Sequence, residues 1–222
     1  MKKGFTIIES IVALTIIIAA VIGPFMLISR GILSSKSAKN RLVAANLAQE
    51  GIEMIRYFRD SNVLASCVGP DGADFDENPD PDWRAITDTS SNCTTLANGN
   101  WEVDATYDLT DAEPRLIAFG ASGRFLNFCQ TPPTATYPNY GLYAYSCLAD
   151  PNPQVTTFKR KITISDPGPE TVCIDPPGPA PCSGTSTTIP ASDRIKVDVT
   201  ILWQDGSISR TLVQTEILYN WR

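Results

Sequence analysis

The chain of 222 residues contains no histidine. This absence excludes the Ser-His and Cys-His pairs of most nucleophilic hydrolases, and it excludes zinc sites that use imidazole ligands. None of the six cysteines has Cys-x-x-Cys spacing, so a thiolate zinc site is not expected either. No internal repeat is present. The information about function therefore lies in where the apolar and charged residues occur along the chain.

Two other patterns approach catalytic motifs. Gly120 to Gly123 have the small residues of a nucleophile elbow but lack its second glycine at the right spacing, which indicates a turn. Glu102, Asp104 and Asp108 alternate with apolar residues along a predicted strand, and this pattern indicates a solvated face more simply than a carboxylate pair. We expect no enzymatic activity and no cofactor.

Charge is scarce near the N-terminus. From Phe5 to Ile28, Glu9 is the only charged residue. At about 1.5 Å per residue, a helix over this run crosses a hydrocarbon core of about 30 Å. A core helix of a soluble protein rarely runs so far without a polar face, so residues 5–29 are predicted to form a transmembrane helix.

A secretory signal peptide is the alternative interpretation, because Lys2 and Lys3 supply the basic start that such a signal has. In such a signal, a small-residue cleavage site follows an apolar stretch of 7–15 residues. Ala19 and Ala20 fit that description, but the apolar run continues past them to Ile28. The sequence favours retention of the segment.

Residues 3–10, continued by residues 11–14, resemble the N-terminal processing motif of type IV pilins and type II secretion pseudopilins. The motif joins a basic leader, a glycine, a phenylalanine, a glutamate four residues beyond it and an uninterrupted apolar helix. The resemblance implies that residues 1–4 are a leader, removed when a membrane peptidase cuts between Gly4 and Phe5 and methylates Phe5.

The same resemblance implies a partner for Glu9. A charge within a membrane costs a few kcal/mol or more, so it is a functional hypothesis by default. In the family, the partner is the α-amino group of a neighbouring subunit's first residue, here Phe5. Pairing neutralises both groups and fixes the axial register of the helices. The alternative is a carboxylate near the interface that protonates or reaches water.

Gly23 and Pro24 interrupt the apolar run and predict a helix break, because proline removes one helical hydrogen bond and kinks the helix. Membrane helices tolerate such a kink. In the family, a nearby helix-breaking proline lets the segment extend as subunits pack, and the resemblance implies a similar mechanical role here.

Helical periodicity continues after the membrane segment. Small and apolar residues recur at three- and four-residue spacing, namely Ala44, Ala48, Ile52, Ile55 and Phe58. This pattern predicts an amphipathic continuation over residues 30–62, so the helix from Phe5 would be about 87 Å long. Its apolar stripe needs a surface to cover it. Residues 45–53 also resemble the matching stretch of many minor pilins.

All six cysteines follow the membrane segment, which indicates disulfides in an extracytoplasmic compartment. Six cysteines allow 15 pairings. We prefer pairing between sequence neighbours because each pair brackets a loop-rich stretch, and the other pairings stay open. The preferred pairs are Cys67 with Cys93, Cys129 with Cys147, and Cys173 with Cys182.

Residues 69–82 form an acidic stretch rich in turn residues. Four side chains have the alternating oxygens of a calcium loop: Asp74, Asp76, Asn78 and Asp80. Pro79 stands where an EF-hand needs glycine, and Ala85 where it needs a bidentate glutamate. A solvated loop is the favoured interpretation, with calcium as the alternative.

Strand patterns fill the rest of the chain. Apolar residues alternate over 101–109, 158–164 and 195–203, and the last run leads into Asp205-Gly206 and a β-rich stretch over 208–219. This predicts a hairpin with a two-residue turn. Residues 131–140 and 166–192, rich in Pro, Gly, Ser and Thr, are predicted to be surface loops.

The predicted fold class is α+β. A long N-terminal helix, with its first half transmembrane, packs on a C-terminal antiparallel sheet that carries disulfide-stapled loops. Residues 63–222 would form the extracytoplasmic β-rich domain. Net charge is −6, or −8 without Lys2 and Lys3, which argues against a bulk nucleic-acid binder. A local basic patch at residues 159–161 stays possible.

Two functional classes fit these features. The resemblance favours a structural subunit of a type IV pilus or related filament. Its partners would be other pilin subunits, a prepilin peptidase, an inner-membrane assembly platform and membrane lipid. The chain's length and disulfide loops favour a minor subunit, and a major subunit or a secretion pseudopilin stays open. The subunit would cross the cytoplasmic membrane once and then enter an extracellular or periplasmic filament. The alternative is a singly anchored extracytoplasmic binding or sensing module that never polymerises.

Overall fold

The computed structural model describes most of the chain. The described residues are 6–65, 67, 83–84, 93–103, 116–130, 141–145, 147, 150, 152–175, 177–178, 181, 184–190 and 193–220. They contain one α-helix and eleven β-strands. The chain divides into two compact units, Met1–Val43 and Ala44–Arg222.

The helix α1 spans Ile7–Leu64, within two residues of the predicted bounds. It continues through Gly23 and Pro24, so the helix does not end at this pair, and the kink predicted there stays a prediction. A proline removes only one hydrogen bond, and the bonds of the flanking turns keep the helix intact. In the second unit α1 buries the predicted stripe, which consists of Ala44, Leu47, Ala48, Gly51, Ile52, Ile55, Phe58 and Asn62.

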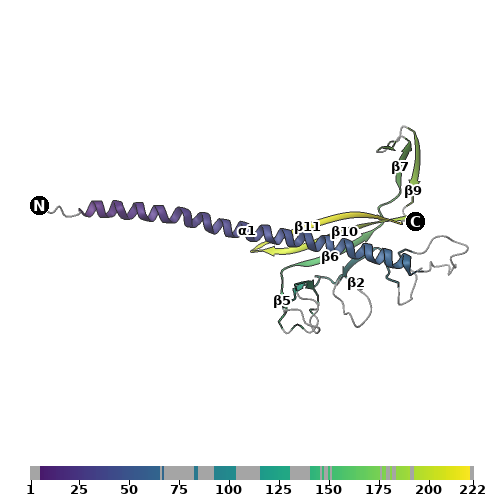
Figure 1. The fold of residues 1–222 in the computed structure, drawn as a ribbon, viewed down its shortest axis with the longest axis horizontal. Coiled ribbons are helices and arrows are strands. Elements are labelled where there is room, and N and C mark those ends of the chain that lie inside the picture. The colour runs from purple at the N-terminus through teal and green to yellow at the C-terminus, as the bar shows by residue number, and fades with distance from the viewer. Residues whose placement is uncertain are drawn as a thin grey trace, which may run out of the picture. The chain divides into compact units, whose positions relative to one another are not determined.

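The main sheet confirms the α+β class. It has five antiparallel strands in the order β11-β10-β6-β1-β2. Figure 1 shows the second half of α1 lying along its long strands. The strands are β1 (Gly99–Val103), β2 (Leu116–Ala118), β6 (Lys159–Ser165), β10 (Arg194–Asp205) and β11 (Ile208–Tyr219).

The C-terminal hairpin confirms the predicted alternation, because every second residue of β10 from Ile195 to Trp203 is buried. Its turn lies one residue later than predicted. Asp205 pairs with Ile208, which leaves Gly206 and Ser207 as the two turn residues. Gly206 has φ +66°, the left-handed conformation that type I′ and II′ turns require at their first central position.

The side chain of Glu102 corrects the predicted solvated face of β1. Glu102 is only 1% exposed. Its carboxylate accepts hydrogen bonds from the backbone N–H of Arg124 (2.8 Å) and from Arg124 Nε (2.5 Å), because the turn over 120–124 covers this side of the sheet. That turn is the one predicted at Gly120 to Gly123, where Gly123 has φ +64°. Asp104 and Asp108 lie outside the described residues.

Residues 166–192 are not simply a loop as predicted. They contain a second sheet, in the order β8-β7-β9, made of β7 (Glu170–Asp175), β8 (Pro177–Gly178) and β9 (Thr185–Ile189). The β-branched residues of β7 and β9 favour extended backbone despite the neighbouring Pro and Gly. A third sheet, β4-β3-β5, is built from β3 (Asn127–Phe128), β4 (Tyr143–Ala144) and β5 (Gln154–Val155). Residues 131–140 lie outside the described residues.

Disulfides join two pairs of sequence neighbours as preferred, Cys67 with Cys93 and Cys129 with Cys147. Cys129 and Cys147 are buried together with Ala144 beside the third sheet. Cys173 is also disulfide-bonded, and Cys182 lies outside the described residues.

Lys159, Arg160 and Lys161 do not form a shared basic patch. They are consecutive residues of β6, so Arg160 points to the face opposite its neighbours, and it is fully buried. On the other face, Asp198 of β10 accepts hydrogen bonds from Thr215 and Lys196. Burial acts to raise the pKa of Asp198, but these hydrogen bonds and the positive charge of Lys196 outweigh it and lower the pKa.

Candidate functional site

The predicted site residues fall into two groups. Glu9 and the Gly23-Pro24 pair lie on α1, in its first half. Gly4 and Phe5 lie outside the described residues, as do the four calcium candidates at positions 74, 76, 78 and 80. Within the described part of the chain, no group of three or more His, Cys, Asp or Glu side chains is placed to hold a metal ion.

The first half of α1 presents an exposed apolar surface. Ile7 is 82% exposed, Phe25 70% and Leu27 71%, and the large apolar side chains between them are exposed as well. Soluble monomers rarely expose apolar patches larger than a few hundred Å². Among the described helices, α1 is the one long and apolar enough to cross a membrane. This surface suggests a membrane anchor or signal, and the disulfides of the second unit suggest an extracytoplasmic location.

The three hydroxyl groups of residues 7–29 are satisfied by the helix itself. Ser10 Oγ donates to the carbonyl of Thr6 (3.4 Å), Thr15 Oγ1 to that of Val12 (2.8 Å) and Ser29 Oγ to that of Phe25 (3.0 Å). Such bonds hide polar groups from an apolar environment. The segment therefore places a single charged group, Glu9, among residues that suit lipid or another apolar helix.

Glu9 lies in the first turn of α1 and is exposed. Its carboxylate has no hydrogen-bond or ion-pair partner among the described residues. The negative charge at this end of the helix is favoured by the helix dipole, but that effect is worth less than about 1 kcal/mol on an exposed surface. It is small beside the cost of placing a carboxylate in hydrocarbon, so a full partner is needed there.

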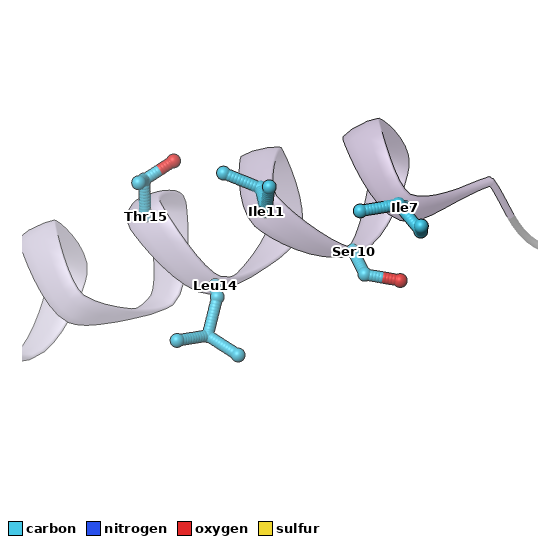
Figure 2. A pocket seen from close by; sticks show the side chains of 5 residues that line it. All are labelled: Ile7, Ser10, Ile11, Leu14 and Thr15. Atoms are coloured by element: carbon cyan, nitrogen blue, oxygen red, sulfur yellow. The ribbon is translucent and has the colours of Figure 1, made fainter.

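A shallow apolar groove lies on another face of the same turns. Figure 2 shows its five lining side chains projecting from successive turns of α1. They are Ile7, Ser10, Ile11, Leu14 and Thr15. Their three- and four-residue spacing places them on one face, whereas Glu9 lies about 160° around the helix from Ile7 and Ile11 and about 100° from Ser10. The groove and Glu9 therefore face different directions around the helix.

The second half of α1 is fixed to the main sheet by a buried arginine. Arg160 of β6 donates to the carbonyls of Leu47 (3.3 Å) and Val103 (2.7 Å), and it forms an ion pair with Glu50 (3.3 Å). Close packing at Gly51 adds to this, because a Cβ atom there would lie 2.9 Å from Val199. The helix and the sheet of the second unit thus form one packed body.

Two further contacts hold the end of the helix. Glu216 of β11 pairs with Arg56, and the hydrogen bond to Glu216 is the main reason that the pKa of Arg56 is raised. The buried amide of Asn62 donates to the carbonyls of Trp83 (3.0 Å) and Thr94 (2.8 Å) and accepts from the N–H of Thr94 (2.8 Å).

Sequence reasoning did not identify Arg160 or Asn62 as anchoring residues. The signal for Asn62 was its place in the stripe, four residues after Phe58. The signal for Arg160 was its position in the alternation of β6, between buried Phe158 and Ile162. In both cases the period predicts burial, and burial of such polar groups requires hydrogen-bond partners.

Comparison with known proteins found no match to a family model, a curated protein or a solved structure.

Proposed function

We propose that the chain is a structural subunit, a minor pilin, of a type IV pilus or related filament. The proposal rests on Gly4 and Phe5 just ahead of α1, on Glu9 in its first turn, and on the apolar, exposed side chains of its first half. In this account a prepilin peptidase removes residues 1–4 and methylates Phe5. The assembly platform then draws the subunit from the membrane into the filament.

The observation that carries the proposal is the unpartnered carboxylate of Glu9 on this apolar surface. A plain membrane anchor gains nothing from a charge in its first turn and pays the cost of burying or hydrating it. A filament subunit gains a partner, because processing creates a positive α-amino group at Phe5, and in a staggered array this group approaches Glu9 of a neighbour. Pairing then offsets the desolvation of both groups and defines the register.

The groove on the opposite face supports the same function. A helix that contacts neighbours in a filament core needs apolar surface on several sides, and Ile7, Ile11 and Leu14 supply it away from Glu9. The second unit would remain outside the core, because its own apolar stripe on α1 is already covered by the main sheet.

The test is incorporation of a Glu9→Ala variant. Filaments are sheared from cells, and the chain is quantified in the filament and membrane fractions. We expect Glu9→Ala to reach the membrane normally and to be lost from the filaments. The matched control is Glu53→Ala, which removes a carboxylate of the same helix that is 52% exposed and pairs with Arg56; it should incorporate normally. Normal incorporation of Glu9→Ala would contradict the proposed role.

The second candidate is a singly anchored extracytoplasmic binding or sensing module. The exposed apolar half of α1 favours it equally, since an anchor needs the same surface. It predicts that the wild-type chain is absent from the sheared fraction and that Glu9→Ala changes nothing.

A further inference from the structure

A basic segment follows the apolar half of α1. Four cationic side chains lie within residues 30–41, and no acidic residue occurs between Glu9 and Glu50. All four side chains are exposed and belong to the same continuous helix. They are Arg30, Lys36, Lys39 and Arg41.

These cations differ from most of the described arginines of the second unit. No ion pair or hydrogen bond joins any of the four to another described residue. In the second unit, by contrast, ion pairs hold Arg56, Arg59, Arg84, Arg124, Arg160 and Arg194. The basic segment therefore has positive charge available for a partner outside the described chain.

Helix geometry sets the depth of each cation when the apolar run is inserted. Twenty uncharged residues separate Glu9 from Arg30, and at 1.5 Å per residue they cover about 30 Å, the thickness of the hydrocarbon core. Arg30 then lies where the core meets the headgroups. Lys36 lies about 9 Å further out, just beyond a headgroup layer of about 5–7 Å.

The last two cations lie further from the bilayer. Lys39 is about 13 Å and Arg41 about 16 Å beyond Arg30 along the helix. Both are within roughly one Debye length of the headgroup surface at physiological salt, so they attract anionic lipid more weakly than Arg30 and Lys36 do.

We propose that the basic segment binds anionic phospholipid headgroups in the leaflet on the side of the globular unit. The inference rests on the proposed function only in requiring membrane insertion. The other possible occupant is an acidic protein surface, such as the second unit of another copy, which has 12 basic and 23 acidic residues. Lipid is favoured because insertion of the apolar run brings headgroups to Arg30 and Lys36 without recruiting any partner.

The full chain is reconstituted into phosphatidylcholine vesicles that contain a trace of spin-labelled phosphatidylglycerol or spin-labelled phosphatidylcholine. Electron paramagnetic resonance then gives the ratio of the two lipids' association constants. We expect a preference for phosphatidylglycerol of about fivefold or more, since each cation near the surface contributes about fivefold. The preference should fall several-fold in Arg30→Gln/Lys36→Gln. The charge-matched variant Lys39→Gln/Arg41→Gln should retain most of it.

Alkaline extraction of the same vesicles separates this inference from the proposed function. A chain released by alkali is not membrane-inserted, and that result would overturn both. An integral chain with equal affinity for the two lipids would overturn the lipid site alone. Equal losses in the two double variants would refute the depth argument. A change in chain self-association, with no change in lipid preference, would assign the segment to an acidic protein surface instead.

Discussion

The close approach of α1 to the main sheet at Gly51 leads to a quantitative prediction. A Cβ atom at position 51 would lie 2.9 and 3.3 Å from the two Cγ atoms of Val199 and 3.4 Å from Cδ of Arg160. Val199 is fully buried and β-branched, so it has little freedom to rotate away. We expect Gly51→Ala to cost about 2 kcal/mol by overpacking and to recover about 1 kcal/mol of helix propensity. The net loss in unfolding free energy is roughly 1 kcal/mol.

A double-mutant cycle isolates the contact from the change in helix propensity. Val199→Ala alone removes two methyl groups from the core and should cost about 2 kcal/mol. In Gly51→Ala/Val199→Ala, the new Cβ atom occupies part of the vacated space. The double variant should therefore be more stable than the sum of the single effects predicts, by about 1–3 kcal/mol.

The assay is urea unfolding of the full chain in detergent, followed by tryptophan fluorescence. With an m-value of about 2 kcal/mol/M, a loss of 1 kcal/mol lowers the midpoint by roughly 0.5 M. Gly31→Ala is the control, because a Cβ atom at Gly31 meets nothing within 4 Å, and it should not lower the midpoint. A rise in stability for Gly51→Ala, together with an additive cycle, would refute this description of the helix–sheet packing.

Three further predictions concern the second unit. Glu50→Gln should lower the unfolding free energy by about 2 kcal/mol, because it leaves fully buried Arg160 without its anionic partner, as urea unfolding would show; the same loss in Glu53→Gln would contradict this cause. Because the pKa of Asp198 is lower in the folded chain than in the unfolded chain, its ionised carboxylate stabilises the fold at neutral pH, and this stabilisation is lost as the pH falls below about 4. Asp198→Asn should therefore flatten the acid limb of a curve of unfolding free energy against pH. An unchanged limb would contradict this cause. Replacing Cys67 and Cys93 by alanine opens the loop that this disulfide closes across a sequence separation of 26 residues. The unfolding free energy should fall by about 3 kcal/mol, as thermal unfolding would show, and an unchanged midpoint would show that the disulfide is dispensable.

The sequence predicted those parts of the fold in which a long helix or strand buries one face and exposes the other. The stripe of α1 and the alternation of β10 each record a single covered face, so the period alone identifies the buried residues. The same reasoning placed Glu102 correctly on the face of β1 opposite Trp101. It predicted a solvent-exposed Glu102 side chain, which is wrong, because a turn about twenty residues later in the chain covers it. No local sequence pattern around Glu102 indicates that turn.

The second sheet was missed for a different reason. Proline and glycine between Asp166 and Ala191 outweighed the β-branched residues of β7 and β9 in the prediction. Short strands are decided by pairing with distant partners rather than by local propensity.

The candidate site was more predictable than the domain that follows it. The apolar run, its single carboxylate and the absence of other charges are properties of consecutive residues, and α1 presents them as a regular exposed helix. The anchoring roles of Arg160 and Asn62 depend on carbonyl groups supplied by other segments, so only the tertiary structure reveals them.

The most direct test of the central claim is the intact mass of the chain recovered from cells with and without a prepilin peptidase. The account predicts loss of Met1 to Gly4 and gain of one methyl group on Phe5 only when the peptidase is present. An unprocessed N-terminus in the presence of the peptidase would contradict the assignment as a filament subunit and favour the singly anchored module.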